Sequence, residues 1–250
     1  MTEAKLVSRT WNQLIVIFKK TYFAITDLAF PTACVGCENF GPWLCADCLK
    51  SLTPPIETCI YCKEKTLHGV TCAVCRRKFH LSGVIFVGEY KNKTLREAVH
   101  TLKFSGVRDL AEPLGDLLAK NILQTLGNNL NQFTLIPLPL HKKRQNERGF
   151  NQSQLLANRI SSLLAIPSQE TLVRTKSAAP QASLNPEIQN LRANNITGVF
   201  SINSSYQATI PEKIIIVDDV STTGATLEEA ASILAQNGTK EIWGAVVCRG

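Results

Sequence analysis

From residue 83 onward, the chain alternates between short apolar runs and longer segments in which apolar residues recur at helical spacing. The short runs predict buried strands, and the longer segments predict amphipathic helices. Strands are expected at 83–90, 133–138, 213–217 and 241–248, and helices at 93–103, 110–126, 153–164 and 226–236.

Strands that alternate with helices of about ten or more residues are typical of a parallel sheet covered by helices. We therefore expect an α/β fold. Thr226 and Glu229 are predicted to form a capping box at the start of the last helix, and Gly238 to end it. Residues 170–199 are polar and turn-rich, which predicts a loop between the third helix and the next strand.

The first 80 residues have a different pattern. Apolar residues at 5–29 follow mostly helical spacing, which predicts an amphipathic helix that ends before Pro31 and covers a neighbouring core rather than a membrane. Residues 34–75 have few apolar periods, so metal must hold them together. We expect three parts: an N-terminal helix (1–30), a cysteine-rich module (31–80) and an α/β domain (81–250).

Eight of the nine cysteines lie in four CxxC pairs, which is the spacing of metal ligands. Eight thiolates suffice for two tetrahedral zinc sites of a structural kind. Sequential and interleaved pairing of the four CxxC motifs both remain open. His68 and His80 are expected to face solvent, and Cys248 to be a buried, reduced thiol. The expected zinc ligands are Cys34, Cys37, Cys45, Cys48, Cys59, Cys62, Cys72 and Cys75.

Composition and charge narrow the class of protein. The 250 residues are 44% apolar, which fits a globular protein with one core of ordinary size and a small appendage. The net charge of +7 predicts an anionic partner, without choosing between a phosphorylated metabolite, a nucleic acid and an acidic protein. The apolar run at 14–18 is too short to cross a bilayer or to form a signal-peptide core. We expect a cytoplasmic protein, whose oligomeric state the sequence leaves open.

The segment 214–226 joins a buried strand, two carboxylates and a hydroxyl-rich turn that enters a helix. The turn can direct backbone N–H groups and hydroxyls at one phosphate, and the helix N-terminus favours negative charge there. Asp218 and Asp219 would repel that phosphate unless they face sugar hydroxyls or hydrated Mg²⁺. A ribose 5-phosphate satisfies both demands. The expected phosphate ligands are Ser221, Thr222, Thr223, Gly224, Ala225 and Thr226.

This segment resembles the 5-phosphoribosyl-1-pyrophosphate (PRPP) motif of type I phosphoribosyltransferases. Residues 136–144 and 148–152 are similar to the signature of the ComF competence-protein family, which is also associated with gluconate-utilisation proteins. The resemblance covers nearly the whole chain from residue 29. It implies a zinc module followed by a type I phosphoribosyltransferase domain, PRPP bound with Mg²⁺, a loop at 174–189 that closes over the diphosphate, and a role in DNA uptake during transformation.

The basic segment after the second strand is expected to be a loop that binds pyrophosphate, through His141, Lys142, Arg144 and Arg148. Arginine binds phosphate oxygens in bidentate fashion, so Arg144 and Arg148 rank first. A solvated basic loop and a nucleic-acid patch are the alternatives. Tyr90 and Phe104 are candidate stacking surfaces for an acceptor. The basic residues that make single-stranded DNA a further candidate partner of the zinc module are Lys63, Lys65, Arg76, Arg77 and Lys78.

Two functions follow from these features. The first is a phosphoribosyltransferase, hence a glycosyltransferase, that displaces pyrophosphate from PRPP with the help of Mg²⁺. Its acceptor cannot be read from the sequence. Asp218 and Asp219 are the catalytic candidates. The second function is that of a non-catalytic accessory protein that senses PRPP or binds single-stranded DNA. A purely structural zinc adaptor is a third, less favoured interpretation.

Overall fold

The computed structural model describes residues 31–52, 56–175 and 198–250. The helix expected at 5–29 and most of the loop expected at 174–189 lie outside these residues. Within the described part of the chain, no helix combines the length and the apolar character needed to cross a membrane.

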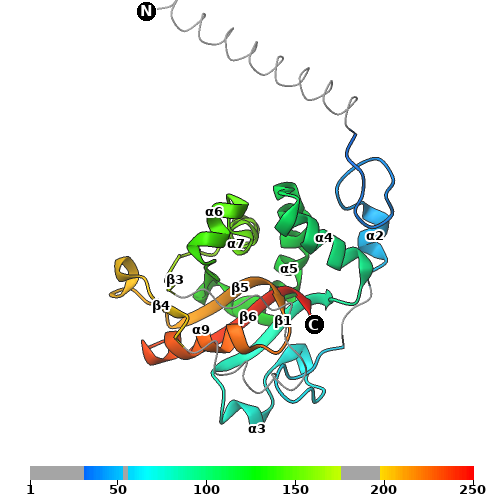
Figure 1. The fold of residues 1–250 in the computed structure, drawn as a ribbon. Coiled ribbons are helices and arrows are strands. Elements are labelled where there is room, and N and C mark those ends of the chain that lie inside the picture. Colours follow the sequence, from blue (N-terminus) through cyan, green and yellow to red (C-terminus); the bar gives the residue numbers. More distant parts are fainter. Residues whose placement is uncertain (1–30, 53–55, 176–197) are drawn as a thin grey trace, which may run out of the picture.

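A parallel sheet of four strands in the order β1-β6-β5-β2 forms the centre of the fold (Figure 1). Each strand confirms a prediction. The strand expected at 213–217 continues through the two aspartates, because residues 218–221 stay paired with β6. The strands are β1 (Leu81–Glu89), β2 (Thr134–Pro137), β5 (Lys213–Ser221) and β6 (Glu241–Arg249).

A separate antiparallel pair, β3 (Leu172–Arg174) and β4 (Phe200–Ile202), brackets the segment 176–197. The polar segment at 170–199 therefore contains one strand, β3, and is followed directly by another, β4. These two strands were not expected, because three residues are too few for an alternation of apolar and polar positions to be recognised in the sequence.

Helices cover both faces of the sheet (Figure 1). One face carries α4 (Lys93–Phe104), α5 (Ala111–Leu126) and α7 (Gln152–Leu164), and the other carries α9 (Ala225–Gln236). Side chains of β5 alternate between the two cores: Ile215 belongs to the α5 side, and Ile214 to the α9 side. This alternation follows from the two-residue period of a strand that is buried on both faces.

Several short helices complete the fold and connect the larger elements. The 3₁₀ helices are short turns of the kind that commonly join larger elements. The short helices are α2 (Ala46–Lys50), α3 (Ala73–Arg76), α6 (Lys142–Arg148), η1 (Leu67–Gly69), η2 (Arg108–Leu110), η3 (Gly127–Gln132) and η5 (Ser204–Tyr206).

Two local predictions were wrong. The basic segment after β2 is the helix α6 rather than a loop, since the ring of His141 accepts the N–H of Lys143 and Gly149 ends the helix in a left-handed conformation. The capping box does not form: Gly224 is the N-cap of α9, and the carboxylate of Glu229 accepts the N–H of Gly198 at 2.5 Å instead.

The two halves of the cysteine-rich module pack on opposite cores. Cys34 and Leu44 of the first half belong to the core on the α4 and α5 side, whereas Ile60 of the second half belongs to the core under α9. The module thus contacts both layers of helices. The boundary predicted at residue 80 falls one residue before β1 begins at Leu81, and the division into separate domains stays a prediction.

Candidate functional site

The acidic pair lies near the carboxyl end of β5, an inner strand of the sheet. Ser153, in the first turn of α7, donates its hydroxyl to Asp218 Oδ1 at 2.8 Å. Lys103, in the last turn of α4, places its Nζ 2.9 Å from Asp219 Oδ1. Three elements far apart in the sequence therefore meet at the two carboxylates.

Burial and mutual repulsion set the electrostatics of this pair. Burial raises the pKa of Asp218 to about 7, and the neighbouring carboxylate of Asp219 adds to the rise. Asp219 is only 3% exposed, and in the described structure its Oδ2 atom is buried without a hydrogen-bond partner. A buried acceptor left unpaired costs about 1–3 kcal/mol. A ligand hydroxyl or a hydrated cation at this oxygen would remove that cost.

The hydroxyl-rich turn, Ser221–Thr226, leads directly from β5 into α9. Gly224 is buried in this turn with φ of 78°, a left-handed conformation that favours glycine. Thr222 and Thr223 are exposed, and the Thr223 hydroxyl accepts the N–H of Ala225 at 3.3 Å. Ser221 is buried within β5. The exposed hydroxyls and the helix N-terminus thus offer hydrogen-bond donors and a favourable field for an anion beside the acidic pair.

The structure separates the four predicted pyrophosphate ligands into two pairs. Arg144 and Arg148 line a pocket together with Lys103, which reaches Asp219. The guanidinium of Arg148 lies 4.9 Å from the ring centroid of Phe104 and donates to Gln152 at 3.0 Å. His141 caps α6, and Lys142 is exposed, and neither lines this pocket.

The pocket has a volume of about 1080 Å³ and opens between α4 and α6. Tyr90 and Phe104, the two candidate stacking residues, both line it, and Phe104 is 64% exposed. Both cations and aromatic rings line it. The complete lining is Tyr90, His100, Lys103, Phe104, Ser105, Gly106, Arg144, Glu147, Arg148 and Phe150.

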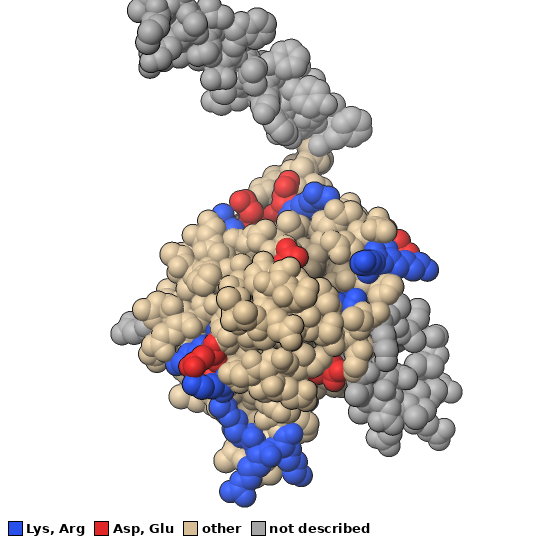
Figure 2. All heavy atoms as spheres, turned by 90° about the vertical axis from the view of Figure 1, so that its left-hand side faces the viewer, with Lys and Arg blue, Asp and Glu red and all other residues tan. Residues whose placement is uncertain are grey.

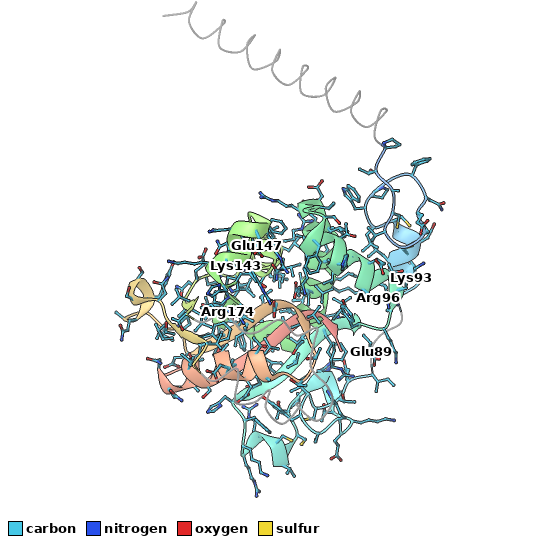
Figure 3. The ribbon with its side chains drawn as sticks, in the orientation of Figure 1. Glu89, Lys93, Arg96, Lys143, Glu147 and Arg174 are labelled. Atoms are coloured by element: carbon cyan, nitrogen blue, oxygen red, sulfur yellow. The ribbon has the colours of Figure 1, made fainter. Side chains whose placement is uncertain are left out.

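The structure also brings Lys103, Ser153 and Arg174 to this region. The sequence assigns no role to Lys103 or Ser153, and it places Arg174 only at the start of the expected closing loop. Arg174 is half-buried, and its Nε has no hydrogen-bond partner among the described residues. Burial lowers the pKa of Arg174, and the nearby positive charge of Arg144 lowers it further. Figure 3 shows Arg174 below α6, the helix that carries the labelled Lys143 and Glu147. No local motif gives Lys103 or Ser153 a role, because each belongs to an otherwise ordinary helix.

The cysteines form two groups of four, each made of two consecutive CxxC motifs. Of the two pairings that the sequence left open, the structure therefore has the sequential one and not the interleaved one. The first group is Cys34, Cys37, Cys45 and Cys48, and the second is Cys59, Cys62, Cys72 and Cys75.

The geometry of both groups fits zinc. The sulfur atoms within each group lie within 4.8 Å of one another, with the Cys37 and Cys45 sulfurs 3.8 Å apart and the Cys62 and Cys72 sulfurs 3.5 Å apart. Tetrahedral zinc with Zn–S bonds of about 2.3 Å requires sulfurs about 3.8 Å apart. The N–H groups of Gly36 and Cys45 also donate to the Cys34 sulfur.

The remaining candidates outside these groups have other contacts. His68 pairs with Glu57, and His80 pairs with Glu228, so neither is needed as a ligand. Cys248 is fully buried in β6, and burial raises the pKa of its thiol to about 12. This confirms the prediction of a buried, reduced thiol.

Comparison with known proteins agrees with this arrangement. The model of the phosphoribosyl transferase domain family matches residues 151–250. The DNA utilization protein YhgH of Shigella flexneri is 31% identical over 234 residues, which cover 89% of this chain and 99% of that protein. The chain belongs to the ComF family. Competence protein F of Haemophilus influenzae is 29% identical over 80% of this chain and 89% of its own, and competence protein ComFC of Bacillus subtilis is 29% identical over 78% and 77%.

A solved structure, the glutamine PRPP amidotransferase of B. subtilis, matches with a TM-score of 0.33 and 17% identity. The match covers 54% of this ComF chain and 25% of that enzyme.

Proposed function

We propose that this ComF protein binds PRPP with Mg²⁺ at the carboxyl end of β5. Asp218 and Asp219 would accept hydrogen bonds from the ribose hydroxyls, and the hydroxyl-rich turn would hold the 5-phosphate. Arg144 and Arg148 would bind the pyrophosphate, together with Lys103. The observation that carries this proposal is the buried oxygen of Asp219, which has no hydrogen-bond partner among the described residues and lies just before the hydroxyl-rich turn. Calorimetric titration of PRPP with MgCl₂ into the purified protein tests it.

Mg²⁺ fits this site because carboxylate oxygens are its preferred protein ligands and Asp219 Oδ2 lacks a partner in the described structure. Lys103 pairs with the other oxygen of Asp219, so Mg²⁺ would bind together with the phosphates of PRPP, whose negative charge offsets that of Lys103. When bound, Mg²⁺ would neutralise the charge that develops on pyrophosphate as it leaves.

We propose further that the pocket between α4 and α6 receives the acceptor of a phosphoribosyl transfer. Breaking the bond between C1 of the ribose and pyrophosphate builds positive charge on the sugar, and the carboxylates of the acidic pair lie where they would stabilise it. Phe104 and Tyr90 offer aromatic faces to a planar acceptor. Pyrophosphate release that depends on an added acceptor would establish an enzyme. PRPP binding without such release would identify a PRPP sensor.

Titration of Asp218 predicts how binding depends on pH. The pKa of Asp218 is raised to about 7, and ribose hydroxyls donate stronger hydrogen bonds to an ionised carboxylate, whose charge also attracts Mg²⁺. The affinity for PRPP with Mg²⁺ should therefore rise with pH. The rise should be about tenfold between about pH 6 and pH 8 if the ionised form alone binds. Calorimetry across this range measures it, and an Asp218→Asn variant shows how much of the dependence comes from the phosphates of PRPP. An identical pH dependence in the variant would exclude Asp218 as the titrating group.

The raised pKa of Asp218 has the opposite effect on the stability of the free protein, which should fall as the pH rises. The folded state holds the Asp218 proton more tightly than the unfolded state does, so this group's contribution to stability falls as the pH rises from 3.8 toward about 7.

Single-stranded DNA is a second proposed ligand, because the relatives are named for competence and DNA utilization. Arg76, Arg77 and Lys78 are all exposed at the end of α3. Figure 2 shows lysine and arginine side chains gathered at the foot of the molecule, the height at which α3 lies in Figure 1. We propose that this basic cluster contacts the DNA backbone. We also place the protein in the cytoplasm, where the eight thiolates stay reduced.

Neutralising the basic cluster should weaken DNA binding and its dependence on salt. The triple variant Arg76→Gln/Arg77→Gln/Lys78→Gln is expected to bind oligodeoxynucleotides more weakly, with a salt slope smaller by about 0.7 for each phosphate that the variant no longer neutralises. Fluorescence anisotropy at several salt concentrations measures both. The matched control, Lys91→Gln/Lys93→Gln/Arg96→Gln, removes the same charge from exposed positions near α4. Equally weakened binding in the two variants would show that DNA binding depends on the net charge of the protein and not on the position of the basic cluster.

A further inference from the structure

The second cysteine group lies directly against the hydroxyl-rich turn. Ile60 stands between its ligands Cys59 and Cys62 and is only 1% exposed. A Cβ atom added to Gly224 would lie 2.9 Å from Ile60 Cγ1, so the isoleucine side chain packs on the backbone of the turn itself. Ile60 also shares a core cluster with Leu227 of α9.

Glu228, in the first turn of α9, joins the same cysteine group to the turn by polar contacts. Its carboxylate accepts the Tyr61 hydroxyl, and it accepts the backbone N–H of His80 at 2.9 Å. The His80 ring nitrogen Nδ1 lies 2.7 Å from the same carboxylate. Tyr61 is itself held by stacking on Phe79, with ring centroids 3.8 Å apart. Glu228 therefore receives contacts from the first CxxC motif of the second cysteine group and from a residue shortly after its last cysteine.

We propose that Ile60 and Glu228 form a clamp by which the second cysteine group holds the hydroxyl-rich turn in its phosphate-binding conformation. This rests on the proposed function of the turn. Ile60 and Glu228 are positioning residues, because they act on the turn through Gly224 and through α9. Zinc would fix the loop Cys59–Cys62 and so the place of Ile60, since the four sulfur atoms of this group already lie within 4.8 Å of one another.

The first cysteine group provides a natural contrast. Gly36, in its first CxxC motif, packs near Thr94 of α4, and Val35 contacts the core on the α4 and α5 side. Val35 follows Cys34 as Ile60 follows Cys59, so the two residues hold equivalent positions in the two groups. A change at Val35 removes a similar apolar side chain on the side of the sheet opposite to α9.

The test compares Ile60→Ala with Val35→Ala in the full, zinc-loaded chain. Zinc content should stay at two equivalents in both variants. Amide hydrogen exchange of peptides that cover residues 221–228 should increase in Ile60→Ala only, because the cavity under Gly224 lets the turn open. The affinity for ribose 5-phosphate should fall by about five- to tenfold in Ile60→Ala, since a turn that is no longer preorganised binds more weakly. Ile60→Val should restore most of both properties.

Unchanged exchange at 221–228 in Ile60→Ala, or equal increases in the two alanine variants, would overturn the clamp. If Ile60→Ala does not fold, Tyr61→Phe decides in its place, because it keeps the stacking on Phe79 and removes only the donor to Glu228. If the wild-type protein does not bind ribose 5-phosphate, the proposed function of the turn fails, and the exchange comparison still decides the clamp.

Discussion

Replacing both Asp218 and Asp219 by asparagine should lower the affinity for PRPP with Mg²⁺ by at least about 100-fold. Hydrogen bonds to charged groups contribute about 1.5–3 kcal/mol each, and the double variant loses two charged acceptors. It also leaves Lys103 without its carboxylate partner, so positive charge that now balances the site would oppose Mg²⁺. Calorimetric titration of PRPP in the presence of MgCl₂ measures the loss.

The control for this variant is Asp109→Asn/Glu112→Gln, which removes the same charge from exposed positions near the start of α5. Its affinity for PRPP should equal that of the wild-type protein. Thermal unfolding of both variants separates a binding defect from a folding defect. Binding of PRPP that survives in the Asp218→Asn/Asp219→Asn variant would refute the proposed site, and the DNA-binding function would become the leading one.

Among the proposed substitutions, removal of a ligand from the second cysteine group should lower the stability of the folded protein most. Structural zinc sites contribute about 10–16 kcal/mol of apparent binding free energy in zinc-finger peptides, and this energy holds the chain folded around the metal. Cys59 is fully buried in its group, so Cys59→Ser should lose one equivalent of zinc. Its unfolding temperature should fall by about 10 °C or more. Metal analysis and differential scanning calorimetry measure the two effects.

Cys248→Ser serves as the matched control, since Cys248 is a buried cysteine outside both groups. It should keep two equivalents of zinc. Cys34→Ser should lose one equivalent from the first group and leave the contacts of Ile60 in place. Retention of both zinc ions by Cys59→Ser would contradict the assignment of this ligand set.

Much of the ComF fold could be predicted from local pattern. The four strands of the main sheet and the four long helices were expected within a few residues of their observed bounds, because each buries enough apolar surface to leave a clear period. The helix α6 was missed because its seven residues contain no apolar period and its identity depends on a cap and a terminal glycine. The capping box failed for a related reason: Glu229 found a backbone donor in Gly198, which is distant in sequence.

The candidate site also combines residues that could be identified from the sequence with residues that could not. The acidic pair, the hydroxyl-rich turn and the cysteines could be named from sequence because each is a contiguous motif or a repeated spacing. Lys103 and Ser153 could not be assigned a role, since their contacts with the two aspartates join α4 and α7 to β5. His141 and Lys142 were grouped with Arg144 and Arg148 by proximity in sequence, whereas a helix directs neighbouring side chains to different sides.

The sequence by itself determined the family, the α/β fold class, the metal-binding character of the cysteines and the motif that carries the proposed PRPP site. These properties depend on residue types that lie close together in the sequence, and such local patterns are the same however the larger elements are arranged. Only the tertiary structure decided that the CxxC motifs pair sequentially, that Lys103 reaches Asp219, and that Ile60 packs on Gly224. Each of these depends on the relative placement of segments whose local patterns are compatible with several arrangements, and burial in a common core selects one of them.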